Sequence, residues 1–458
     1  MSDNVTIIGA GLVGSLLSIY LSKRGYKVSV YEKRPDLRKN RISAGKSINL
    51  ALSDRGWRGL EGVGIADEIR KVAIPMKGRM IHNTDGKINF QPYGKEGQAI
   101  YSVSRGGLNC VLMDLAEKHG AEFFYNERCT HIELNTATSY YENAETKKNI
   151  SVSAERIFGT DGAFSAARLQ LQLSTDRFEY SQHYLEHSYK ELVIPPTASG
   201  DFAMETNALH IWPRGQFMLI ALPNLDKSYT CTLFFPFEGE KSFAALDTKE
   251  KMLDFFEKTF PDAVPLMPTL EQDYFAYSAA SLVTVKCFPW SYEDKILLLG
   301  DAAHAIVPFF GQGMNCGFED CVVLNKLMDD LTPNPSPKGE GNWALLFSRF
   351  EEERKKNSDA IAELAVQNFV EMRDLVGHPD FLLRKKIEAY LNEHYPEKWK
   401  PLYSMVTFSD TPYSTAFLEG KKQDVIMKEV MALRNISENW QTPETIHRIL
   451  SIIEKHSM

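Results

Sequence analysis

Hydrophobic and polar positions follow two distinct rhythms over residues 4–32. Residues 4–8 (NVTII) are a short, mostly apolar run, which predicts a buried strand. Residues 15–25 (SLLSIYLSKRG) place apolar side chains at positions 16, 17, 19 and 21, as on one face of a helix, and the glycine at 25 marks the helix end. Residues 26–32 (YKVSVYE) predict a second strand. Together these patterns predict one β-α-β unit of about 30 residues.

The turn between the first strand and the helix carries the glycine spacing G-x-G-x-x-G, within IIGAGLVG at residues 7–14. Gly9 permits a tight turn, Gly11 allows the backbone to approach a pyrophosphate, and Gly14 allows the helix to pack close to the strand. The helix N-terminus then presents unpaired N–H groups to the phosphates. Glu32 ends the second strand, where a carboxylate accepts a hydrogen bond from a ribose hydroxyl and repels a 2′-phosphate. This motif predicts a site for FAD or NAD rather than NADP.

The later patterns predict an α/β protein with a sheet-rich insertion. Residues 78–104 alternate between polar and apolar around an Asp-Gly turn, and residues 108–120 have the pattern of a helix that ends in glycine. Many strand-like runs lie between residues 185 and 285. The remaining expected segments are a Pro- and Gly-rich loop at 332–342 and helices within 343–376 and 420–457.

Composition narrows the class of protein. The chain has 458 residues, which suggests two or three structural units, and its net charge of −8 disfavours a nucleic-acid partner. The six cysteines form no CxxC pair and no histidine cluster keeps metal-ligand spacing, so we expect free thiols in a reducing compartment and no metal site. No basic region precedes the N-terminal apolar run, and the longest charge-free run, 302–318, is too polar to span a membrane. We therefore expect a cytoplasmic protein without a membrane anchor.

Two further motifs bear on the choice of dinucleotide. The first is FGTDGAFSAAR at residues 158–168, and the second is ILLLGDAAHAIVPFFGQGMNCGFED at residues 296–320. In the second motif a buried strand presents Asp301 at its end, and a glycine-rich turn leads into a new helix. A carboxylate at a strand end beside a helix N-terminus can hold a polyol and the polar edge of a ring. We therefore expect Asp301 at the ribityl hydroxyls of a flavin, and the N–H groups near Met314 and Asn315 at its ring.

The three motifs, in this order, resemble the set that marks the FAD-dependent aromatic hydroxylases. GAGLVG with Glu32, then DGAFSAAR, then GDAAHAIVPFFGQG occur in one chain, whereas NAD-dependent dehydrogenases lack the two later motifs. The resemblance implies bound FAD, NADPH as co-substrate, and transfer of oxygen to an aromatic ring through a flavin hydroperoxide. It implies no catalytic side chain, because the flavin carries the chemistry. No second G-x-G-x-x-G unit occurs, so NADPH is expected to dock transiently near the flavin.

The resemblance narrows to the kynurenine 3-monooxygenase family and implies hydroxylation of L-kynurenine to 3-hydroxykynurenine with NADPH and O₂. The C-terminal tail is charged and lacks the apolar anchor of membrane-bound members, so the chain resembles the soluble, bacterial-type members. Cys316 stands where the family commonly has alanine. The segments that carry this resemblance are GKSINLALSDRG (45–56), GRMIH (78–82), PYG (92–94), YSVSR (101–105), DFAMETNALHIWPR (201–214), QNFVEMR (367–373) and PLYSMVTFS (401–409).

The resemblance implies a Rossmann-like FAD-binding domain, a β-sheet substrate domain and a helical C-terminal region. Because the motifs are scattered along the chain, we expect the first two domains to be discontinuous. The expected boundaries are 1–75, 100–180 and 286–331 for the FAD-binding domain, 76–99 and 181–285 for the β-rich substrate domain, and 343–458 for the C-terminal helical region.

The resemblance also implies which residues bind each ligand. Arg79 suits the substrate carboxylate because its guanidinium fork can pair bidentately, and tyrosine hydroxyls can add hydrogen bonds. Residues 368, 371 and 372 share one helix face by their spacing. The set expected at the substrate is Arg79, Tyr93, Asn368, Tyr403, Met372, Glu371, Phe310 and Pro308. The set expected at FAD is Gly9, Gly11, Val13, Gly14, Glu32, Lys33, Arg34, Ala51, Arg105, Cys129, Asp161, Ala166, Asp301, Gly313, Met314 and Asn315.

Ordinary structural roles compete with several of these assignments. Without the family, an arginine on a β-hairpin such as Arg79 is most often a solvated charge, and a buried tyrosine such as Tyr403 is most often part of a core. We expect His304 to be packed or hydrogen-bonded rather than catalytic, and Gln312 to shape the loop beside the flavin. Two other functions stay open: a flavin hydroxylase of another aromatic acid, and a non-catalytic FAD-binding redox or interaction module. The oligomeric state also stays open, with a homodimer among the options.

Overall fold

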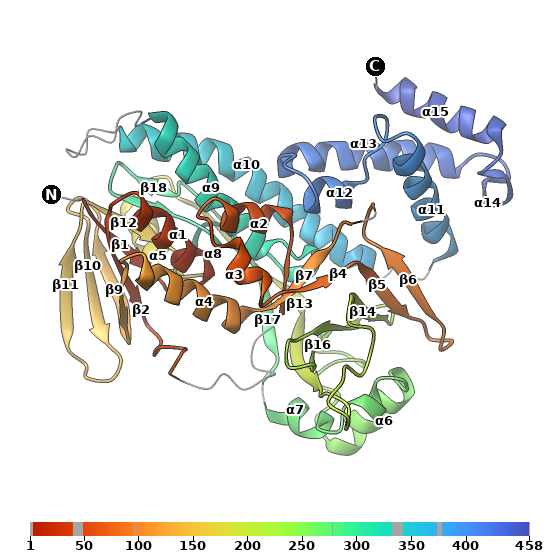
Figure 1. The fold of residues 1–458 in the computed structure, drawn as a ribbon, viewed down its shortest axis with the longest axis horizontal. Helices are drawn as coiled ribbons and strands as arrows, with labels where there is room; N and C mark the ends of the chain where they lie inside the picture. Colours follow the sequence, from red (N-terminus) through yellow and green to blue (C-terminus); the bar gives the residue numbers. More distant parts are fainter. Residues whose placement is uncertain are drawn as a thin grey trace.

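The computed structural model describes residues 3–39, 49–95, 97–276, 278–331, 342–372 and 378–457. A six-stranded sheet with the order β18-β19-β12-β1-β2-β8 forms one half of the molecule (Figure 1). Its neighbouring strands are parallel except at the β18 edge. Its strands are β1 (Asn4–Ile8), β2 (Lys27–Glu32), β8 (Glu122–Tyr125), β12 (Arg156–Gly159), β18 (Ser291–Tyr292) and β19 (Ile296–Leu298).

The predicted β-α-β unit lies at the centre of this sheet. β1 and β2 pair in parallel, and α1 (Leu12–Lys23) connects them, with every residue from Gly14 to Leu21 buried. Gly25 has a φ of +87°, the left-handed conformation that ends helices, as expected. The parallel sheet and its crossover helix confirm the expected α/β class. The other helices of this half are α2 (Asp54–Glu61), α3 (Ala66–Arg70), α4 (Arg105–Lys118), α5 (Ala166–Ser174), α8 (Asp301–His304) and α9 (Gly313–Leu331).

Two small antiparallel sheets flank the parallel one. The first has the order β3-β7-β4. Of its strands, β7 was expected from the alternation in residues 78–104, whereas β3 and β4 were not. The second, with the order β11-β10-β9, was not predicted, because its half-exposed strands carry few apolar residues. The strands are β3 (Asn49–Leu52), β4 (Ile74–Met76), β7 (Ile100–Ser104), β9 (Glu127–Glu133), β10 (Thr138–Asn143) and β11 (Asn149–Ser153).

A seven-stranded sheet with the order β17-β13-β16-β15-β14-β5-β6 forms the second layer. β5 and β6 are the hairpin expected around an Asp-Gly turn, and β5 joins the sheet by pairing in parallel with β14. The sheet therefore unites segments that lie more than a hundred residues apart. Its strands are β5 (Gly78–His82), β6 (Ile88–Pro92), β13 (Glu179–Ile194), β14 (Ala208–Pro213), β15 (Met218–Pro223), β16 (Tyr229–Pro236) and β17 (Ala280–Phe288).

The segment between β16 and β17 is helical, whereas the sequence analysis identified only strand-like runs between residues 185 and 285. Thr248 caps the first helix by accepting a hydrogen bond from the Lys251 amide, and the buried Met252 and Phe256 lie one turn apart. The helices pack against the sheet in a core that includes Trp212. This helical pattern was overlooked because strand-like runs surround it. The elements are α6 (Lys249–Thr259), the 3₁₀ turn η1 (Val264–Leu266) and α7 (Leu270–Ala276).

The C-terminal part is helical, as predicted, and its last helices form a separate layer at one end of the molecule (Figure 1). The expected loop at 332–342 lies almost entirely outside the described residues, as do residues 373–377. Among the helices that the structure describes, none is long and apolar enough to cross a membrane. The elements from η2 onward, apart from α9, are η2 (Pro308–Phe310), α10 (Trp343–Val370), α11 (Pro379–His394), α12 (Leu402–Thr407), α13 (Tyr413–Met431), α14 (Ile436–Asn439) and α15 (Pro443–Ser457).

Candidate active site

A cavity of about 860 Å³ lies between the two large sheets and α12. One end is lined by the turns after β1, β2, β12 and β19, at the carboxyl ends of parallel strands, where α/β sheets bind their ligands. The other end is lined by β5, β15, η2 and α12. A cavity of this size with an apolar lining and a few converging polar groups is typical of a ligand site.

The glycine turn after β1 forms one wall of the cavity. Gly9 has a φ of +101°, and a Cβ added there would lie 2.7 Å from the Thr160 carbonyl oxygen. A Cβ at Gly14 would lie 2.1 Å from the Gly9 carbonyl oxygen, so Gly14 allows α1 to pack against the turn and stays out of the lining. Gly11, in contrast, lines the cavity, and nothing lies within 4 Å of where its Cβ would be. The space beside Gly11, at the start of α1, is therefore suited to a pyrophosphate.

Replacing Gly11 with alanine should weaken FAD binding by about tenfold or more, the equivalent of roughly 1.4 kcal/mol. The added methyl group would occupy the space that the pyrophosphate needs. Folding should be unaffected, because Gly11 has a φ of −75° and its Cβ would meet no protein atom. Titration of the apoprotein with FAD, together with a thermal melt, measures both effects. Equal FAD affinity in the two proteins would contradict the placement of the pyrophosphate.

Glu32 ends β2 at the cavity, and protein donors already hold its carboxylate. Oε2 accepts from the Ala10 amide at 2.9 Å, while Oε1 accepts from the amide of Arg34 at 3.0 Å and from its Nε at 2.8 Å. A carboxylate offers about four lone-pair sites, so Glu32 can still accept from a ribose hydroxyl. Its orientation is thus fixed before a ligand arrives. Lys33 also lines this end of the cavity.

Asp161, from the second motif, lines the cavity but directs its carboxylate to the protein. It accepts hydrogen bonds from the Ser165 hydroxyl and from the amides of Ala166 and Ala167. Burial raises the pKa of Asp161, and these donors act against that rise. Asp161 therefore accepts from the first amides of α5. It contributes to the cavity by fixing the shape of the turn that lines it. The nearby thiol of Cys129 also lines the cavity, and burial raises its pKa to about 12.

The third motif brings Asp301 and a glycine turn to the middle of the cavity. Gly300 has a φ of +58° at the sharp turn from β19 into α8. Asp301 follows, lines the cavity, and makes no hydrogen bond or ion pair within the described residues. Its carboxylate is free to accept from the hydroxyls of a bound polyol. The start of α9 contributes Gly313 and Met314 to the lining.

Asn315 does not line the cavity, and its side chain works inside the protein. Its amide nitrogen donates to the carbonyls of Ala51 and Gly311, and its oxygen accepts from the Ser53 amide. Asn315 therefore fixes the glycine turn against β3. Of the residues expected at FAD, those in the lining are Gly9, Gly11, Val13, Glu32, Lys33, Arg34, Ala51, Arg105, Cys129, Asp161, Ala166, Asp301, Gly313 and Met314.

The far end of the cavity holds one cation beside a stacked pair of aromatic rings. The Arg79 guanidinium carbon lies 5.3 Å from the ring centroid of Tyr93 and 5.0 Å from that of Tyr403. The two tyrosine rings stack with their centroids 5.3 Å apart, and Phe310 stacks on Tyr403 at 5.6 Å. Pro308 and Met372 complete the expected set in the lining, so six of the eight residues predicted at the substrate line one space.

Two polar atoms of this cluster are buried without a partner. Neither Nε of Arg79 nor the hydroxyl of Tyr93 makes a hydrogen bond within the described residues. Burial raises the pKa of Tyr93 and of Tyr403, so both hydroxyls stay protonated and can donate. Burial would lower the pKa of Arg79, but the two tyrosines and Glu371 raise it, so the guanidinium stays charged. The charged guanidinium of Arg79 and the Tyr93 hydroxyl, which has no hydrogen-bond partner among the described residues, are suited to a carboxylate.

Two of the predicted substrate residues do not reach the cavity surface. Asn368 is buried on α10, and its amide nitrogen donates to the Phe309 carbonyl at 2.6 Å and to the Met372 sulfur at 3.3 Å. Glu371 lies 3.6 Å from the ammonium group of Lys385. Helical spacing correctly placed Asn368 beside Met372. It could not show that the side-chain amide of Asn368 would donate to the backbone carbonyl of Phe309. In this structure Asn368 supports the wall formed by η2.

Sequence reasoning missed most of the apolar lining. Met218, Ile220 and Leu222 alternate along β15 and all line the cavity, together with Leu209 on β14 and Phe234 on β16. The signal was available, because residues i, i+2 and i+4 of a strand share one face. What the sequence did not indicate is which face of this sheet meets the cavity.

His304 is hydrogen-bonded in a buried cluster, as expected. Its Nε2 lies 2.7 Å from Asp320, and its Nδ1 lies 3.9 Å from the Cys316 sulfur. These three residues could in principle hold a metal ion. However, Arg354 donates from Nε to Asp320 at 2.7 Å and from a terminal nitrogen to the Cys316 sulfur at 3.2 Å. A guanidinium group therefore already supplies the positive charge at this cluster.

Comparison with known proteins agrees with the geometry of the cavity. A family described as "FAD binding domain" matches residues 3–363. Proteins named kynurenine 3-monooxygenase from Flavobacterium johnsoniae and Flavobacterium psychrophilum are 50% and 49% identical to this chain, each over 99% of both chains. Among solved structures, p-nitrophenol 4-monooxygenase from Pseudomonas putida aligns with a TM-score of 0.68 at 16% identity, covering 90% of this chain and 98% of that chain. At that identity the structural match shows the fold alone.

Proposed function

The chain belongs to the kynurenine 3-monooxygenase family of FAD-dependent monooxygenases, and we propose that it hydroxylates L-kynurenine to 3-hydroxykynurenine. NADPH supplies two electrons, one oxygen atom of O₂ enters the ring, and the other leaves as water. FAD, when bound, supplies the redox chemistry and the activation of oxygen. The protein must bind the substrate, orient its ring and keep water out.

The observation that carries this proposal is the cluster of Arg79, Tyr93 and Tyr403 in an otherwise apolar end of the cavity. Its unpartnered donors match the carboxylate of an amino acid, and a bidentate contact with the guanidinium would fix the direction of the rest of the molecule. The aminophenyl ring would then lie against the apolar side chains of η2 and β15, such as Phe310 and Met218. This ring is electron-rich, which suits an electrophilic oxygen donor.

The opposite end of the cavity supports the assignment of FAD. Gly11 leaves room for the pyrophosphate, Glu32 is oriented for a ribose hydroxyl, and the Asp301 carboxylate has no partner among the described residues. We therefore propose that the six-stranded sheet and its helices bind FAD, and that the seven-stranded sheet and α12 enclose the substrate. This division follows the expected boundaries 1–75, 100–180 and 286–331 against 76–99 and 181–285.

The proposal is tested by mixing FAD-loaded protein with NADPH and L-kynurenine in air, and following NADPH loss and product mass together. We expect a product heavier by one oxygen atom, formed one-to-one with NADPH. NADPH loss that yields hydrogen peroxide but no product would show that kynurenine is not the substrate and would favour another aromatic acid. Bound FAD with no kynurenine-dependent oxidation would overturn the proposal.

A further inference from the structure

Helix α12 carries Tyr403 to the cavity, yet it has only six residues and cannot be stable alone. The last carbonyls of any helix lack partners inside the helix, and a basic side chain can satisfy them. Here Arg55 does so from α2, more than three hundred residues away in the sequence. Its Nε donates to the Val406 carbonyl at 2.9 Å, and a terminal nitrogen donates to the carbonyl of Thr411 and, at 3.5 Å, to that of Met405.

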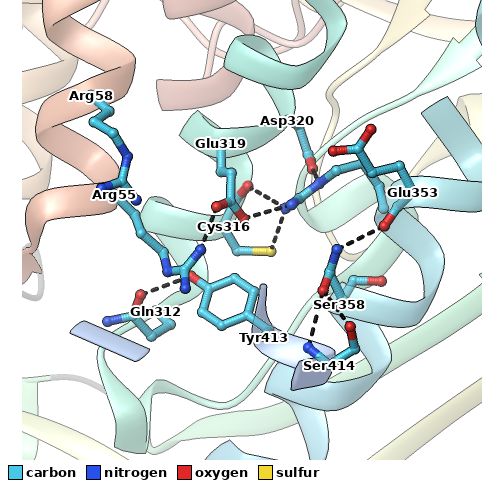
Figure 2. A network of polar contacts seen from close by, with 12 residues as sticks. Arg55, Arg58, Gln312, Cys316, Glu319, Asp320, Glu353, Ser358, Tyr413 and Ser414 are labelled. Carbon is cyan, nitrogen blue, oxygen red and sulfur yellow. Dashed lines mark hydrogen bonds and ion pairs between the residues drawn. The ribbon is translucent and has the colours of Figure 1, made fainter. Parts of the chain in front are cut away.

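Arg55 is buried, and a network of charges holds it in place (Figure 2). Its other terminal nitrogen pairs with Glu319 on α9, and Glu319 pairs in turn with Arg354 on α10. These arginines lower the pKa of Glu319 although burial opposes the shift. The network fixes the guanidinium fork so that its remaining donors face the end of α12.

The same guanidinium packs on a tyrosine that reaches the cofactor turn. The Arg55 guanidinium carbon lies 3.9 Å from the ring centroid of Tyr413, at the start of α13. The Tyr413 hydroxyl donates to the side-chain oxygen of Gln312 at 2.8 Å. Gln312 lies between Gly311 and Gly313, which both line the cavity. Figure 2 shows the stacked pair with Gln312 on one side and Glu319 on the other.

We propose that Arg55 is a positioning residue for the substrate, because it holds the Tyr403 helix and, through Tyr413, the cofactor turn in one fixed relation. This proposal rests on the proposed function. The two walls come from distant parts of the chain, and Arg55 links them through Tyr413, in addition to the stacking of Phe310 on Tyr403. A small shift of Tyr403 would displace the substrate carboxylate, and a misplacement of about 1 Å can cost up to about a hundredfold in rate.

The test is the variant Arg55→Lys in the FAD-loaded full-length protein. Lysine keeps the charge for Glu319 but cannot present a planar fork to three carbonyls. We expect the KM for L-kynurenine to rise about ten- to a hundredfold, and the product formed per NADPH to fall with a matching rise in hydrogen peroxide. FAD affinity should stay the same. Hydrogen exchange of the amides in residues 402–411 should become faster in the variant, and this measurement does not depend on activity.

The matched control is Arg58→Lys, one turn along the same helix. Within the part of the chain that the structure describes, the Arg58 guanidinium donates to the Ser409 carbonyl at 3.2 Å, beyond the end of α12, and to no carbonyl of α12 itself. This variant should leave KM, coupling and exchange near the wild-type values. Tyr413→Phe keeps the ring on Arg55 and removes only the bond to Gln312, so it should reduce coupling while KM changes little.

The outcomes separate the two proposals. If the wild type hydroxylates kynurenine but Arg55→Lys keeps its KM, coupling and exchange, the positioning role is wrong. A lower melting temperature with unchanged KM would show a merely structural role and would also overturn it. If the wild type does not hydroxylate kynurenine, the proposed function fails, while exchange in 402–411 still decides whether Arg55 holds α12. Should Arg55→Lys not fold, the charge-neutral pair Arg55→Met with Glu319→Gln permits the same measurements.

Discussion

Arg79→Met should raise the KM for L-kynurenine about a hundredfold while the protein keeps its FAD. Removing one partner of a buried, hydrogen-bonded charge pair costs about 2–5 kcal/mol, and every 1.4 kcal/mol is tenfold. Methionine fills similar space, so the apolar packing against Tyr93 and Tyr403 should survive. The guanidinium lies at the far end of the cavity from Glu32 and Gly11, so the FAD site should be unaffected.

Whether the Arg79 substitution changes KM or kcat is as informative as the size of the change. The carboxylate contact is the same in the bound substrate and in the transition state, so its loss should change KM more than kcat. Arg79→Lys, which keeps the charge without the fork, should give an intermediate KM. The decarboxylated analogue of kynurenine should bind wild type and Arg79→Met equally. If the variant lost affinity for that analogue as well, Arg79 would be shaping the cavity rather than binding the carboxylate.

The parts of the fold that could be predicted are those with a strong local signal. The β-α-β unit at the N-terminus follows from strand and helix periodicity within about 30 residues, and the glycine turn occupies its required context. The β5–β6 hairpin follows from alternation around an Asp-Gly turn. Helix α6 carried an equally local signal, with Thr248 as its cap, but strand-like runs on both sides obscured it. Strands β9 and β11 are largely exposed and carry only two apolar residues each, so they gave no core-forming signal, although NISVS in β11 alternates.

The parts of the site that could not be predicted depend on where a polar side chain finds its partner. Asn368 stands in a motif that suggests a ligand contact, yet the Phe309 carbonyl takes its amide group. The side chain of Asn315 likewise bonds to backbone carbonyls, while the expected contact of the nearby backbone N–H groups with the flavin stays a prediction. Asp161 likewise caps α5. Arg55 gave no signal at all, since the hydrogen-bond partners of its side chain lie 264 to 356 residues away. Local sequence indicates which residues can bind, whereas packing decides which of them remain free to do so.

Gly14→Ala should lower the free energy of unfolding by about 1–3 kcal/mol and abolish retention of FAD. The added Cβ would lie 2.1 Å from the Gly9 carbonyl oxygen and 2.5 Å from the Thr160 hydroxyl oxygen. The first of these atoms is backbone and cannot rotate away, so α1 must move from β1. That movement would displace Gly11, which lines the cavity where the pyrophosphate is expected.

Gly107→Ala is the matched control for this substitution. Gly107 lies in the first turn of α4, and its added Cβ would meet Ser104 at 3.5 Å, an ordinary contact. Alanine also favours a helix over glycine by at most about 1 kcal/mol, so this variant should be as stable as wild type or slightly more stable. Urea unfolding and the ratio of FAD to chain after gel filtration measure both variants. If Gly14→Ala kept both stability and FAD, close packing of α1 on the glycine turn would not be what builds the cofactor site.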